Sequence, residues 1–174
     1  MKKLVYLLLV SLVSFGFFSC NEKEDNTEWR EANIAAYEKI AMDPSYELLK
    51  GEPGSPLGVY YKEVKKGDGQ LYPIQTSKVK ALYKGSYYDK SVFDAGSSVN
   101  EVPLDITLNG YPIPVRGLST AMQTMVVGDK WEIVVPYYLG YGAADTYDDY
   151  GRMVMRGYTT LFFEIELLEI ELHP

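Results

Sequence analysis

The sequence predicts an α+β domain, an antiparallel β-sheet with one short helix over a face, preceded by an N-terminal helical extension. Several segments alternate apolar with polar residues, the pattern of half-buried strands. One short segment among them has helical spacing instead. The 15 glycines, nine prolines and 16 tyrosines among 174 residues also favour a β-rich fold with many turns.

The predicted strands follow one another from residue 58 onward. Val59–Lys66 is the first, and it ends at the turn Gly67-Asp68-Gly69. Four later strands carry their apolar residues at every second position: Val79, Ala81 and Tyr83; Leu104, Ile106 and Leu108; Trp131, Ile133 and Val135; and Leu161, Phe163, Ile165 and Leu167. Ser119–Met125 is expected to form the short helix, with Ser119 as its cap and Met122 and Met125 facing inward.

A helix is predicted over Thr27–Ala41, before the sheet. It carries an apolar stripe at helical spacing: Trp29, Ala32, Ala36, Tyr37 and Ile40. Asp43-Pro44 ends it, and we expect one further helical turn over Tyr46–Lys50 before a linker, Gly51–Pro56. Two roles remain open for the stripe, because it could mediate dimerisation or pack on its own domain.

The first residues read as a secretory signal peptide rather than as part of the fold. Two lysines precede an apolar run, Leu4–Phe18, that is shorter than a membrane span. The run ends at Ser19-Cys20, which resembles a bacterial lipobox and predicts a lipid on Cys20; a free thiol near an ordinary cleavage site is the alternative. The acidic residues that follow resemble the surface-export signal of Bacteroidota lipoproteins, or are a solvated tether.

These features predict three regions and a location. Residues 1–19 are a signal peptide, 20–57 the lipidated cysteine, tether and helix, and 58–174 the folded domain. We expect the protein in a bacterial cell envelope, anchored by lipid to the outer membrane on its periplasmic or surface face.

Composition excludes several kinds of chemistry. The formal net charge of −7 argues against nucleic acid as a partner. A single His and a single Cys argue against a zinc site, a Ser-His-Asp triad, a Cys-His pair or a disulfide framework. We therefore expect no metal and no cofactor, and any enzyme here must work through shape, desolvation and hydrogen bonding.

Three segments in order share the motifs of one family. Residues 82–85 and 92–94 read Leu-Tyr-Lys-Gly and Val-Phe-Asp. Residues 115–118 read Val-Arg-Gly-Leu, and 125–142 contain Met-Val-Val-Gly-Asp and Leu-Gly-Tyr-Gly. Residues 160–168 read Thr-Leu-Phe-Phe-Glu-Ile-Glu-Leu-Leu. Together they resemble the FKBP family, the prolyl isomerases that bind tacrolimus and rapamycin.

The resemblance implies a peptidyl-prolyl cis-trans isomerase that assists folding of envelope or exported proteins, with a sheet wrapped around one short helix. It implies these pocket residues: Tyr83, Phe93 and Phe163 as aromatic walls, Asp94 as an acceptor, and Val115 N–H and Tyr141 O–H as donors to substrate carbonyls. It adds substrate contacts at Leu104, Leu118, Val154 and Met155. Its implied partners are proline-containing segments of client proteins and macrolides of the tacrolimus and rapamycin type.

The chain departs from the family motifs at three places, one of which is the Tyr- and Asp-rich loop Ala143–Arg152. Leu118 stands where the family has the tryptophan of the pocket floor, and Met155-Arg156-Gly157 stands where it has Ile-Pro-Pro. These departures keep a second hypothesis open, a peptide-binding or chaperone module of the same fold with little or no turnover.

Overall fold

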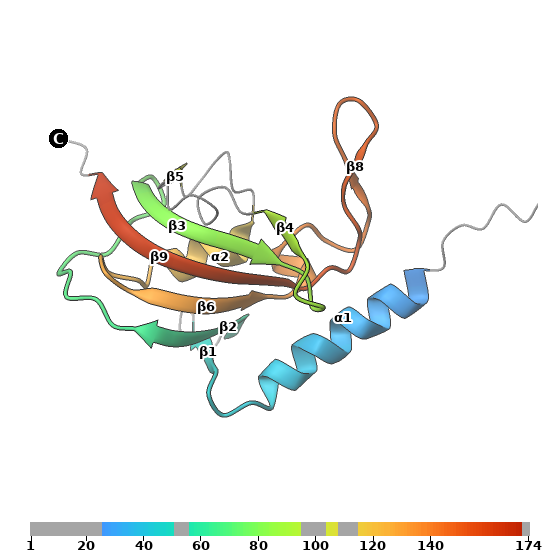
Figure 1. Cartoon of the computed structure of the whole chain (residues 1–174), viewed down its shortest axis with the longest axis horizontal. Coiled ribbons are helices and arrows are strands. Elements are labelled where there is room, and N and C mark those ends of the chain that lie inside the picture. The colour runs from blue at the N-terminus through green and yellow to red at the C-terminus, as the bar shows by residue number, and fades with distance from the viewer. Residues whose placement is uncertain (1–25, 51–55, 95–103, 108–114, 172–174) are drawn as a thin grey trace, which may run out of the picture.

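The sheet and its two helices are seen in a computed structural model, which describes residues 26–50, 56–94, 104–107 and 115–171 (Figure 1). The elements are α1 (Asn26–Ala41), β1 (Glu47–Lys50), β2 (Pro56–Lys65), β3 (Lys78–Ser86), β4 (Val92–Asp94), β5 (Leu104–Thr107), α2 (Arg116–Met122), β6 (Lys130–Val135), the 3-10 turn η1 (Tyr137–Leu139), β7 (Thr146–Tyr147), β8 (Met153–Met155) and β9 (Leu161–Glu171).

The main sheet is antiparallel and has the order β1-β2-β6-β9-β3-β4, with β5 also paired to β3. It curves around α2, which contacts β2 and β6 (Figure 1). The predicted α+β class is therefore confirmed.

The period-two pattern identifies the core correctly on three strands. Val79, Ala81 and Tyr83 of β3 are buried, as are the inward residues of β6 and β9: Trp131, Ile133, Val135, Leu161, Phe163, Ile165 and Leu167. Met122 and Met125 are also fully buried, as predicted. The apolar faces of sheet and helix thus form one core. Of the predicted alternation at Leu104, Ile106 and Leu108, the first two residues lie on β5, whereas Leu108 lies outside the described residues.

Two local predictions are wrong. Tyr46–Lys50 was expected to be helical, but Glu47–Lys50 forms β1, which pairs with β2 and buries Leu49 in the core. Strand pairing here outweighs the local helical preference. Ser119 does not cap α2, because the helix begins at Arg116 with Val115 as its N-cap and no side-chain cap. The sheet also extends before residue 58, since β2 begins at Pro56.

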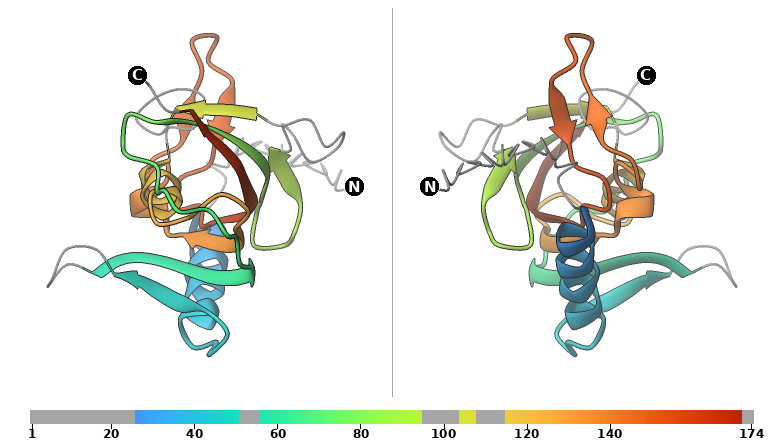
Figure 2. Two further views of the ribbon diagram at one scale, coloured as in Figure 1. Left: turned by 90° about the vertical axis from the view of Figure 1, so that its left-hand side faces the viewer. Right: turned by 90° about the vertical axis from the view of Figure 1, so that its right-hand side faces the viewer.

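Helix α1 packs on its own domain, one of the two roles left open for it. It runs across the end of the sheet beside β2 and the β3–β4 turn (Figure 2). Tyr37 donates a hydrogen bond to the carbonyl of Gly58 (2.6 Å), and Trp29 Nε1 donates to Thr159 Oγ1 (3.3 Å). The helix is therefore fixed at both ends of its apolar stripe.

Asn33 is the one fully buried residue of α1, and its polar side chain is satisfied. Its Oδ1 accepts from Thr160 N (2.9 Å) and its Nδ2 donates to Trp29 O (2.9 Å). Thr160 Oγ1 also donates to Asn33 O (3.0 Å). Buried polar groups are stable only when paired, so these bonds attach the helix to the residue that precedes β9.

The chain between η1 and β9 projects from the body as a hairpin (Figure 1). β7 and β8 pair antiparallel, with Thr146 opposite Met155 and Tyr147 opposite Met153. Asp148 closes the turn, because its Oδ1 accepts from the backbone N–H groups of Tyr150 and Arg152, each at 2.9 Å.

Candidate prolyl-isomerase pocket

Three strands bring the predicted aromatic walls to one place. Tyr83 lies on β3, Phe93 on β4 and Phe163 on β9, and β3 pairs with both other strands. The rings of Phe93 and Phe163 meet edge to face, with centroids 5.9 Å apart and an interplanar angle of 84°. Phe163 and Tyr83 are buried and Phe93 is half-buried, so Phe93 is the wall most open to a ligand.

Gly85 explains how the two phenylalanines come so close to β3. A Cβ atom at this position would lie 2.5 Å from Phe93 Cζ and 3.2 Å from Phe163 Cε1. Carbon atoms do not approach that closely without displacement, so the Tyr-x-Gly motif keeps space for the rings.

A hydrogen bond fixes the polar side of this aromatic cluster. Tyr83 donates its hydroxyl to Asp94 Oδ2 at 2.5 Å. Tyr83 is buried and Asp94 is exposed, so the carboxylate lies at the rim with one oxygen already held. Bonds to an ionised acceptor are short and strong, which fixes the orientation of Asp94.

Val115 and Leu118 approach from the helix side. Val115 is buried and is the N-cap of α2, so its N–H lies outside the helical hydrogen-bond ladder. Leu118 is fully buried one turn later, and it belongs to the same core cluster as Val115, Tyr83 and Phe163. Leu118 therefore supports the pocket from inside the core.

Tyr141 follows η1 and packs half-buried against the core. The backbone before it is held by Gly140 N–H, which donates to the carbonyl of Tyr137 (3.0 Å). Burial, and then the charges of Asp94 and Tyr87, raise the pKa of Tyr141 above its ordinary value. Its hydroxyl stays protonated at neutral pH and is therefore a hydrogen-bond donor.

The remaining predicted substrate contacts differ in their surroundings. Met155 is buried in the core, whereas its neighbour Val154 on β8 is 48% exposed. Leu104 begins β5, opposite Ala81 of β3, and its side chain lies outside the described residues. Cys20 also lies outside them.

The sequence model of the "FKBP-type peptidyl-prolyl cis-trans isomerase" family matches residues 70–168. The chain belongs to this family. The 22 kDa FKBP-type peptidyl-prolyl cis-trans isomerase of Escherichia coli is 32% identical over 161 residues, which are 92% of this chain and 73% of that protein. The prolyl-isomerase activity expected from the motifs is thus supported by the family and by its named relatives.

Two further comparisons extend over most of the chain. The outer membrane protein MIP of Legionella longbeachae is 29% identical, over 81% of this chain and 58% of that protein. The crystal structure of FkpA from Escherichia coli superposes with a TM-score of 0.69 at 28% identity, covering 87% of this chain and 63% of that chain. The FKBP-like fold predicted from the sequence is therefore confirmed.

Sequence reasoning missed the residues that extend the FKBP-type aromatic cluster toward α1. Tyr87 packs on Phe93 with ring centroids 5.1 Å apart, and Trp29 packs on Tyr87 at 5.7 Å. Arg156 lies over Trp29 at 5.3 Å and donates from Nε to Asn26 Oδ1 (2.6 Å). In the sequence, the adjacent Tyr87 and Tyr88, which shortly precede Phe93-Asp94, could have indicated this extension of the aromatic cluster.

In the described part of the chain, no helix is long and apolar enough to cross a membrane. Within the same residues, no cluster of three His, Cys, Asp or Glu side chains is arranged to hold a metal ion.

Proposed function

We propose that this enzyme rotates X–Pro bonds in the pocket walled by Tyr83, Phe93 and Phe163. Rotation about a peptide bond costs about 18–20 kcal/mol, because it breaks amide resonance. The twisted transition state has less charge separation than the planar amide. An apolar pocket therefore disfavours the planar ground state more than the twisted one. The aromatic walls supply that medium and hold the proline ring.

Two donors hold the substrate backbone while the bond turns. Val115 N–H binds one carbonyl, and Tyr141 O–H, which stays protonated, binds another. Asp94, held by Tyr83, accepts a hydrogen bond at the rim. Leu104, Val154 and Met155 complete the contacts around the proline and its neighbours, and Leu118 supports them from inside the core. Fixing the ends of the rotating segment lowers the entropic part of the barrier.

The observation that carries this proposal is the arrangement at β3. The strand supplies Tyr83 to hold Asp94, and it supplies Gly85, whose missing side chain admits both Phe93 and Phe163. Residues far apart in sequence thus meet in one apolar cluster with Asp94 at its edge. An apolar site with a few polar groups is the form of a small-molecule or peptide site, which supports the proposal.

A peptide-binding or chaperone module with little turnover is the second candidate. Leu118 supports it, because a fully buried leucine offers less aromatic contact area than a tryptophan floor. Arg156-Gly157 supports it too, since these residues are engaged by α1 and Asp145 rather than forming an apolar rim. The same pocket would then bind proline segments or macrolides without accelerating rotation.

Proline exchange by NMR on a short Leu-Pro peptide separates the two candidates. We expect the chain from Asn21 onward to accelerate exchange, and Phe93→Ala to lower the acceleration at least tenfold by removing the open wall. Val92→Ala is the matched control, because Val92 precedes Phe93 on the same strand and is 51% exposed. A folded parent that binds peptide without accelerating exchange, and still binds after Phe93→Ala, would establish the binding module instead.

We propose that a lipid on Cys20 anchors the enzyme in a bacterial envelope, after removal of residues 1–19. The basic start, the apolar run and Ser19-Cys20 support this processing. Its substrates there are proline-containing segments of envelope or exported proteins. Mass spectrometry of the protein from its native membranes tests the anchor. Cys20→Ser should remove the lipid mass and release the protein from the membrane fraction; an unmodified Cys20 in the parent would exclude the anchor.

A further inference from the structure

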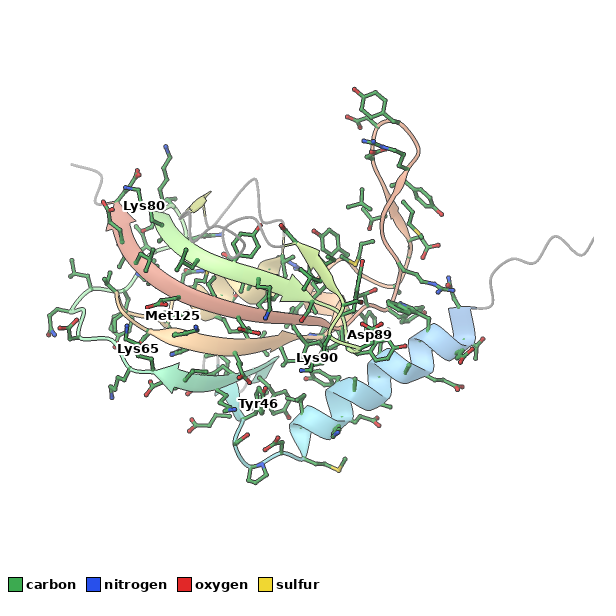
Figure 3. All side chains as sticks on the ribbon, in the orientation of Figure 1. Tyr46, Lys65, Lys80, Asp89, Lys90 and Met125 are labelled. Carbon is green, nitrogen blue, oxygen red and sulfur yellow. The ribbon has the colours of Figure 1, made fainter. Side chains whose placement is uncertain are left out.

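A second pocket lies beside the isomerase pocket, between α1, the β3–β4 turn and β8. Its volume is about 280 Å³, and it is lined by Trp29, Tyr87, Ser91, Met153, Val154, Met155 and Arg156. This volume is near the lower end of the ~300–1,000 Å³ typical of ligand sites, so it has room for one large side chain. In Figure 3 the labels Asp89 and Lys90 mark the β3–β4 turn, whose Tyr87 and Tyr88 contact Trp29 of α1.

Trp29 is held in place as the wall that α1 contributes. Its indole N–H donates to Thr159, and its ring meets Tyr87 and Tyr88 edge to face, with centroids 5.7 and 5.4 Å away. The guanidinium of Arg156 lies 5.3 Å from the ring centroid. A tryptophan fixed on several sides presents an apolar surface with little entropy left to lose on binding.

The lining of the pocket is mainly apolar and partly open to solvent, and Ser91 and the charged Arg156 are its polar members. Trp29 comes from α1 and Tyr87 from the β3–β4 turn, whereas Met153 and Val154 come from β8. Met153 is 53% exposed and Val154 is 48% exposed, although both are large apolar residues. An apolar side chain that enters the pocket would remove these surfaces from water, which is favourable.

Shared and touching side chains link the second pocket to the aromatic walls. Tyr87 contacts both Trp29 and Phe93, and Met155 lines this pocket and also belongs to the core cluster that contains Phe163. Successive centroid separations of 5.7 and 5.1 Å place Trp29 within about three extended residues of Phe93, at roughly 3.3 Å per residue.

We propose that Trp29 and β8 form a specificity pocket for a large apolar client side chain about three residues from the proline. The inference rests on the proposed function, because it adds a subsite to the same substrate groove. It gives α1 a part in substrate selection. Helix α1, which precedes the matched family domain, thereby affects which X–Pro sequences bind next to Phe93.

The test compares X–Pro peptides that carry either Phe or Ala at one position. In one pair of peptides this position is three residues before the proline, and in the other pair it is three residues after it. We expect kcat/KM to favour Phe about tenfold on one side, the lower end of the range for an apolar pocket, because this pocket is open. Trp29→Ala should bring the ratio close to one. Arg30→Ala, a change at the next residue of α1, is the matched control and should keep the preference.

Met153→Glu tests the part of the pocket that β8 contributes and leaves α1 unchanged. It places a charge where an apolar side chain would bind, so the preference for Phe should again be lost. A preference that survives both Trp29→Ala and Met153→Glu would overturn the inference, as would a parent enzyme that turns over Phe and Ala peptides equally on both sides.

A binding measurement separates this inference from the proposed function. The chain has two tryptophans, so its indole N–H spectrum has two signals, and Trp29→Phe assigns them. The Trp29 signal should shift on addition of the preferred Phe peptide and not of its Ala counterpart, with or without turnover. A shift without turnover would refute the isomerase and keep the pocket, whereas turnover without a shift would refute the pocket and keep the isomerase.

Discussion

Asn33→Ala should weaken the attachment of α1 to the rest of the domain. The change removes the acceptor of Thr160 N–H and the bond from Nδ2 to Trp29 O. Asn33 is 0% and Thr160 1% exposed, so water does not readily replace the lost acceptor. An unpaired buried N–H costs about 1–3 kcal/mol, and the lost bond to Trp29 adds about 0.5–1.5 kcal/mol.

These terms predict a loss of about 2–4 kcal/mol in the free energy of unfolding. For a chain of this size the melting temperature should fall by roughly 5–10 °C, measured by circular dichroism. Limited trypsin digestion gives a local readout, because cleavage at Arg30 and Lys39 should accelerate once α1 detaches. Glu31→Ala, an exposed change on the same helix, should alter neither. Equal melting temperatures for the Asn33 and Glu31 variants would refute the reasoning.

Three further predictions concern the pocket. Tyr83→Phe removes the bond to Asp94, and kcat/KM should fall about tenfold with little change in fold; equal turnover would show that Asp94 needs no such support. Gly85→Ala puts a Cβ 2.5 Å from Phe93 Cζ, so turnover should fall and the Phe93 ring resonances should shift. The pKa of Tyr141 is raised above the ordinary tyrosine value of about 10, so its hydroxyl stays protonated and kcat/KM should not change between pH 6 and pH 9. A change of kcat/KM within this pH range that disappears in Tyr141→Phe would contradict this prediction.

The sequence predicted the parts of the fold that depend on local periodicity. On β3, β6 and β9, buried apolar residues alternate with residues that are mostly less buried, so the alternation identifies both the strand and its buried side. β1 has four residues, Glu47–Lys50, and its pairing with β2 cannot be read from so short a pattern. The β7–β8 hairpin was missed for a similar reason, since its strands are shorter still.

The candidate site was predicted through motifs, and its extension was not. Tyr83, Phe93 and Phe163 lie within the recognised segments, and the structure brings them together. Trp29 and Asn33 precede those segments, and their partners Thr159 and Thr160 follow more than a hundred residues later. A stripe at helical spacing shows that α1 has a face to bury, but it does not show what covers that face.

Because of the position of β9 in the sheet, the pocket is complete only after this last strand has folded. This strand lies between β6 and β3, although it comes after both in the chain, and it also supplies Phe163. A fragment that stops before Leu161 leaves the edges of β3 and β6 unpaired and lacks one wall of the pocket. Such edges attract other chains, so an unfinished domain is prone to aggregate. An isomerase of this topology therefore needs protection from aggregation until its own last strand has joined the sheet.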